Sequence, residues 1–114
     1  MDDCLFCKMV SHEIEPDVVY EDEDVLAFRD INPQAPVHIL IIPKRHISTL
    51  NDLQAGDAEL MGKLYLTATK VAKLEGIADA GYRTLVNCNE EGGQEVFHIH
   101  LHLVGGRRMS WPPG

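Results

Sequence analysis

Histidine and apolar residues alternate strictly along residues 96–104, and two glycines follow at once. This period-2 alternation predicts a β-strand. Successive side chains of a strand point to opposite faces, so we expect His98, His100 and His102 to share one face. The other face is apolar, and we expect it to pack against the core: Phe97, Ile99, Leu101 and Leu103.

Three imidazoles in one row are hard to explain as packing alone, because protonating one ring penalises the protonation of its neighbour. Adjacent rings on that face would lie about 6–7 Å apart, which is two strand rises. Two chemistries use such a row. Either the rings chelate a metal, or one ring is a nucleophile while its neighbours position and neutralise an anion. The spacing alone leaves both open.

The size and charge of the chain narrow the class of protein. Its 114 residues predict one domain, residues 1–114, and the longest apolar run, residues 39–42, predicts no membrane span. A net charge of −8 argues against a nucleic-acid partner, which needs a basic surface, but allows a small phosphate ligand. Three cysteines, an odd number, with no signal-peptide pattern predict a cytoplasmic protein.

The order of apolar patterns predicts an α+β fold with an antiparallel five-stranded sheet, one short helix and one long helix. The short helix covers residues 4–10, and the long amphipathic helix covers residues 54–75 and is stopped by Gly76. Five runs predict strands, with 37–42 reading as central: residues 18–20, 25–29, 37–42, 81–89 and 96–104.

Cys4 and Cys7 have the C-x-x-C spacing of half a zinc site or of a redox pair. A redox pair would follow a strand in a βαβ unit, which the predicted order of elements lacks. Two buried thiols without chemistry remain the alternative.

Residues 98–104 match the signature of the histidine triad (HIT) family, in which three histidines alternate with apolar residues and an apolar pair follows. Residues 28–36, 42–47, 92–94 and 111–114 resemble the Hint branch of that family. The resemblance extends over nearly the whole chain. It implies a HIT-like fold and a two-fold homodimer in which the sheets of the two subunits merge.

The resemblance also implies a hydrolase that cleaves the P–N bond of purine nucleoside 5′-phosphoramidates, with AMP or GMP derivatives as ligands. His100 would attack phosphorus and form a nucleotidyl-histidine, His102 would bind a phosphate oxygen, and His98 would orient the site and relay protons. The chemistry is reasonable, because imidazole is mostly neutral and nucleophilic at pH 7 and a covalent route splits one difficult displacement into two. Catalysis would need no metal.

The nucleotide site carries over residue by residue. Asp30 would hold the ribose hydroxyls, and Asn87 would lie on the phosphate side. An apolar slot would surround the base: Leu5, Phe6, Met9, Phe28 and Ile31. Backbone N–H groups of one segment would stabilise the phosphate charge: Gly93, Gln94, Glu95 and Val96. Glu95 departs from the pattern, since some members have there a serine that serves the leaving group.

Related bacterial members carry both cysteines with zinc, and the resemblance therefore implies a structural Zn²⁺ held by Cys4, Cys7, His46 and His98. Two alternatives stay open. In one, the three triad histidines bind a catalytic zinc that activates water. In the other, the chain is a nucleotide-binding regulatory module.

Overall fold

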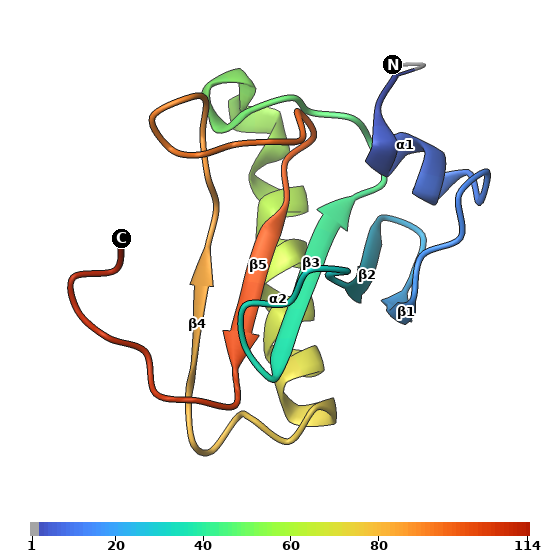
Figure 1. Cartoon of the computed structure of the whole chain (residues 1–114). Coiled ribbons are helices and arrows are strands. Elements are labelled where there is room, and N and C mark those ends of the chain that lie inside the picture. The colour runs from blue at the N-terminus through green and yellow to red at the C-terminus, as the bar shows by residue number, and fades with distance from the viewer. Residues whose placement is uncertain (1–2) are drawn as a thin grey trace.

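Strand β3 (Val37–Pro43) lies at the centre of a five-stranded antiparallel sheet, with the order β1-β2-β3-β5-β4 (Figure 1). The computed structural model describes residues 3–114. The central place of β3 follows from its apolar run, because every residue from His38 to Pro43 is buried. The remaining strands are short: β1 (Val18–Glu21), β2 (Val25–Arg29), β4 (Tyr82–Leu85) and β5 (Leu101–Gly105). The predicted α+β architecture is confirmed.

The two faces of the sheet carry different helices. Helix α2 (Ala58–Leu74) lies behind the sheet in Figure 1 and packs on the larger core cluster, whose members include Ile39, Ile41 and Leu101. Helix α1 (Leu5–Val10) lies near the end of β3, and its Phe6 belongs to a smaller cluster on the opposite face. Two 3₁₀ turns, Leu50–Asp52 and Ala55–Asp57, lead into α2.

The histidine strand is shorter than predicted. β5 begins at Leu101, residues 96–98 form bends, and Phe97 is 48% exposed instead of facing the core. Pro43 explains the early end of the pairing. The register pairs Ile41 with Leu101, and two positions further on it would place Pro43 opposite Ile99, where Pro43 has no backbone N–H to donate. The N–H of Ile99 instead donates to the carbonyl of Ile47, at 2.7 Å.

Other boundaries differ less. The predicted strand 81–89 is limited to β4, and the predicted helix 54–75 is α2 preceded by a 3₁₀ turn. Gly76 ends α2 as predicted, because it adopts φ +73°, a left-handed conformation that glycine enters at little cost. No helix within residues 3–114 is both long enough and apolar enough to cross a membrane.

Candidate active site

The His100 ring is held with one nitrogen free to act as a nucleophile. Its Nδ1 lies 2.8 Å from the carbonyl oxygen of His98. A carbonyl only accepts, so Nδ1–H donates and the lone pair is left on Nε2. The ring packs edge-on against Phe6, with centroids 5.1 Å apart, and burial lowers the pKa of His100. The imidazole is therefore neutral near pH 7.

The His102 ring presents a proton donor. The backbone N–H of Gln34 donates to His38 Nδ1 at 3.0 Å, which places the His38 proton on Nε2. That Nε2–H donates to His102 Nδ1 at 2.9 Å, so His102 carries its own proton on Nε2. Among the described residues, His102 Nε2 is a buried side-chain nitrogen without a hydrogen-bond partner. A buried donor without an acceptor is costly, and an anionic oxygen would satisfy it.

His38 is a site residue that the sequence reasoning missed. The β3–β5 register pairs Leu40 with His102 and His38 with Val104, which puts the two imidazoles diagonally opposite on one face. A lone histidine in the apolar run of β3 was the available signal. Burial is the main cause that lowers the pKa of His38, and burial also lowers that of His102, to about 4.

Asp30 lies beside the ring of His38. Its Oδ2 is 3.5 Å from His38 Nε2, while its Oδ1 accepts from the backbone N–H of Asn32 at 2.8 Å. Ligand atoms of Asp30, His38 and His102 lie within 4.8 Å of one another. Because the Gln34 N–H occupies Nδ1 of His38, its Nε2 carries a proton and offers no lone pair to a metal. We read this group as a hydrogen-bond relay.

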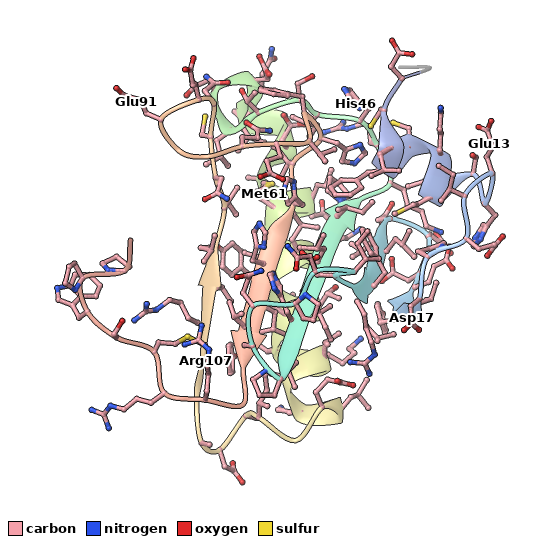
Figure 2. All side chains as sticks on the ribbon, viewed as in Figure 1. Glu13, Asp17, His46, Met61, Glu91 and Arg107 are labelled. Carbon is pink, nitrogen blue, oxygen red and sulfur yellow. The ribbon has the colours of Figure 1, made fainter. Side chains whose placement is uncertain are left out.

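A second group joins the N-terminal helix to the sheet. Cys4 Sγ is 3.4 Å from His98 Nδ1, and Cys7 Sγ is 3.6 Å from the same atom and 3.3 Å from His46 Nδ1. These separations suit a tetrahedral zinc, whose ligand atoms are spaced about 3.4–3.8 Å apart. Figure 2 shows His46 beside α1. Sequence reasoning brought these four residues together correctly, and their role as ligands stays a prediction.

The outer nitrogens of both imidazoles in this group are already engaged. His98 Nε2–H donates to the carbonyl oxygen of Pro43 at 2.7 Å, and His46 Nε2 lies 3.1 Å from Ser48 Oγ. Such outer contacts fix the ring and leave Nδ1 directed at the metal position. The three triad histidines, in contrast, do not form one ligand group within residues 3–114. The geometry therefore disfavours a zinc chelated by the triad.

The expected base slot is assembled in part. Phe6 and Phe28 meet edge to face, with centroids 5.4 Å apart, and Met9 packs against the same cluster. Ile31 is 98% exposed and Leu5 is 39% exposed, so these two residues lie outside the cluster. Asn87 lies half-buried beyond the end of β4.

The expected phosphate-binding segment needs a correction. The N–H of Gly93 donates to the carbonyl of Glu90, and that of Gln94 to the carbonyl of Asn89, both at 3.0 Å. These two amides are therefore used within their own turn. Among the described residues, the amides of Glu95 and Val96 have no such partner, and they remain the candidate donors.

The Gln94 side chain fixes this segment by hydrogen bonds to backbone groups. Its Nε2 donates to the carbonyls of Ser48, at 2.8 Å, and Val96, at 3.1 Å, while its Oε1 accepts from the N–H of Asn89 at 2.8 Å. With all these groups satisfied, the side chain holds three segments together and is not available to a ligand.

The family described as HIT domain matches residues 11–109. The chain belongs to the HIT family. A purine nucleoside phosphoramidase of Escherichia coli strain K12 is 52% identical over 109 residues, which are 96% of this HIT protein and 92% of the relative. A 14 kDa zinc-binding protein of Brassica juncea is 51% identical, over 98% of this chain and 100% of its own.

A solved structure supports the fold of this HIT protein directly. The HIT family hydrolase from Legionella pneumophila Philadelphia 1 superposes with a TM-score of 0.97 at 57% identity, covering 98% of this chain and 100% of its own. The expectation of a HIT-like fold is confirmed.

Proposed function

We propose that this HIT protein hydrolyses purine nucleoside 5′-phosphoramidates through a covalent nucleotidyl-histidine at His100. One observation carries the proposal: the lone pair of His100 Nε2 and the unpaired N–H of His102 belong to neighbouring rings, whose centroids lie 5.0 Å apart. A nucleophile and a buried donor side by side suit attack on a phosphate whose oxygen needs a partner. The E. coli relative named for this activity supports it.

The steps follow from the tautomers. His100 Nε2 attacks the α-phosphorus, the P–N bond breaks, and the nitrogen takes up a proton from solvent water and leaves as an amine. The nucleotidyl-imidazole is then cationic, and its Nδ1–H stays bonded to the carbonyl of His98. His102 Nε2–H donates to a phosphate oxygen, and water releases the nucleotide and restores the neutral ring.

We propose further that Asp30 binds the ribose hydroxyls and that the cluster around Phe6, Phe28 and Met9 receives the base. Two carboxylates, Asp30 and Glu95, act electrostatically on His100. Negative charge at the site suits a monoanionic phosphoramidate better than a polyphosphate.

We propose a structural zinc at Cys4, Cys7, His46 and His98, with all four positions taken by protein ligands. When bound, the ion ties α1 to the sheet, and no reaction step passes through it. The Brassica relative named as zinc-binding supports this assignment. A homodimer with merged sheets, a cytoplasmic location and the lack of nucleic-acid or membrane partners also remain predictions.

A substrate panel tests the activity. Purified protein should cleave adenosine and guanosine 5′-phosphoramidates, and acyl-adenylates should be compared beside them, each with and without a chelator. We expect phosphoramidate turnover that survives chelation. Turnover that disappears with the metal and returns on adding zinc would favour the catalytic-zinc alternative, and nucleotide binding without turnover would favour a regulatory module.

A further inference from the structure

His98 belongs to both sites at once. Its ring, which is fully buried, points Nδ1 at Cys4 and Cys7 and donates from Nε2 to Pro43. Its backbone carbonyl, 2.8 Å from His100 Nδ1, accepts the hydrogen bond that leaves the nucleophilic lone pair on Nε2. Whatever fixes the ring of His98 therefore also fixes the acceptor that orients His100.

The segment that carries this carbonyl has few other restraints. Residues 96–98 form bends outside the sheet ladder. Besides the bond from His100 to the His98 carbonyl and the contacts of the His98 ring with the two cysteines, three hydrogen bonds hold residues 96–99 within the described part of the chain: Gln94 to the Val96 carbonyl, the His98 ring to Pro43, and the Ile99 N–H to Ile47. A metal bound to the His98 ring would add a further and stronger restraint.

Helix α1 provides a second connection. It has six residues, too few to be stable alone, and the Sγ of its N-cap Cys4 accepts from the Cys7 N–H at 3.3 Å. Phe6 lies between the two cysteines in sequence and is 3% exposed. Its ring packs against both His98 and His100, with centroid distances of 5.9 Å and 5.1 Å. Holding both cysteines therefore holds Phe6 against the nucleophile.

We propose that the group of Cys4, Cys7, His46 and His98 is a positioning device for the active site, so that zinc there and a purine nucleotide at His100 strengthen each other's binding. His98 is the positioning residue, acting through His100. The inference rests on the proposed nucleotide site and on the proposed zinc.

The test measures both affinities. AMP binding is titrated calorimetrically to zinc-loaded and zinc-free protein, at a temperature where amide NMR spectra show both to be folded. Zinc affinity is measured by chelator competition with and without AMP. Coupling is reciprocal, so zinc should tighten AMP, and AMP should tighten zinc, by the same factor, about tenfold. Cys7→Ser should bind AMP as the zinc-free protein does, while Cys88→Ser, outside the group, should match the wild type.

A spectroscopic readout separates positioning from a general loss of stability. Imidazole ¹⁵N spectra should show His100 as the Nδ1–H tautomer with zinc and as a mixture of tautomers without it. If the zinc-free protein does not fold, the same comparison is made between zinc and cadmium, whose longer bonds shift the ring; equal AMP affinities would then overturn the proposal.

The outcomes separate the two proposals. Equal AMP affinity and an unchanged His100 tautomer in both metal states would overturn the coupling and leave the phosphoramidase proposal standing. Protein that never binds zinc would overturn the coupling in the same way. Protein that binds zinc but no AMP in either state would overturn both.

Discussion

The orientation of the Asp30 carboxylate is fixed by contacts at both of its oxygens. One carboxylate oxygen accepts from the Asn32 amide and the other lies beside His38, so the group is held in place. We predict that Asp30→Asn weakens charge-assisted hydrogen bonds to the ribose, each worth about 1.5–3 kcal/mol at most. The Michaelis constant for ribonucleotide substrates should rise. The ratio of activity on ribonucleotides to activity on 2′-deoxy substrates should fall. An unchanged ratio of ribo to deoxy activity would remove Asp30 from the site.

The pKa of His100 predicts the pH dependence. His100 acts in its neutral form, and burial lowers its pKa below the usual 6.5. As pH falls, the ring therefore stays neutral through 6.5 and becomes protonated only at lower pH. The acid limb of the kcat/KM profile should therefore have its midpoint below pH 6.5. An acid limb with its midpoint at the ordinary histidine pKa would contradict this.

For single residues, the sequence predicted which side chains lie close together but not which hydrogen bonds join them. Cys4, Cys7, His46 and His98 lie together and Asp30 lies beside His38, while the roles that the resemblance gives these residues stay predictions. His38 was missed, because its contact with His102 depends on strand register, which the local pattern does not reveal. Likewise, the sequence does not reveal the turn in which the amides of Gly93 and Gln94 are hydrogen-bonded to carbonyls, so both were predicted as phosphate donors.

Among the elements, the loop between β4 and β5 is shaped by a close backbone approach at Gly92. A Cβ there would lie 2.5 Å from the carbonyl oxygen and 2.7 Å from the nitrogen of Cys88, both backbone atoms. We predict that Gly92→Ala destabilises the fold by about 1–3 kcal/mol and raises the Michaelis constant, since the displaced loop carries the Glu95 and Val96 amides.

Gly62 is the matched control for this prediction. It is exposed within α2, and a Cβ there would meet nothing within 4 Å. Gly62→Ala should stabilise the protein by about 0.5–1 kcal/mol. Urea denaturation of both variants gives the comparison; equal stabilities would mean that the Cys88 contact imposes no constraint.

The element boundaries that the sequence missed have identifiable causes. Alternation predicted a strand over 96–104, but pairing needs a partner, and β3 ends at Pro43. Residues 96–98, the first part of the alternating run, therefore lie outside the sheet. The ring of His98 contacts Cys4 and Cys7 instead. Where the local signal is strong and needs no partner, as at Gly76, the predicted end is correct.

For the whole molecule, the open edge at β4 predicts assembly. β4 is four residues long and exposes Tyr82 and Leu85 at 36% and 37%. Within residues 3–114, it pairs with β5 alone. An unpaired edge with apolar side chains favours pairing with a second copy, which would merge the two sheets. Sedimentation velocity at micromolar concentration should give a dimer, and Leu85→Glu should shift it toward monomer.

Leu66→Glu is the control for assembly, because Leu66 is 69% exposed on α2 beside Tyr20, near the opposite edge of the sheet. This variant should remain dimeric. A wild-type monomer, or equal dissociation in both variants, would exclude pairing through β4.

The central claim is that His100 becomes covalently bonded to the nucleotide during turnover. Protein mixed with adenosine 5′-phosphoramidate, quenched in milliseconds and analysed by intact and peptide mass spectrometry, tests it most directly. We predict one adenylyl group on His100, formed and lost at rates consistent with turnover. The exposed-histidine variant His12→Asn should form the same adduct. His100→Ala should form no adduct and lose about a thousandfold or more in rate. Full turnover with no adduct at any time, or a tenth of wild-type activity in His100→Ala, would contradict it.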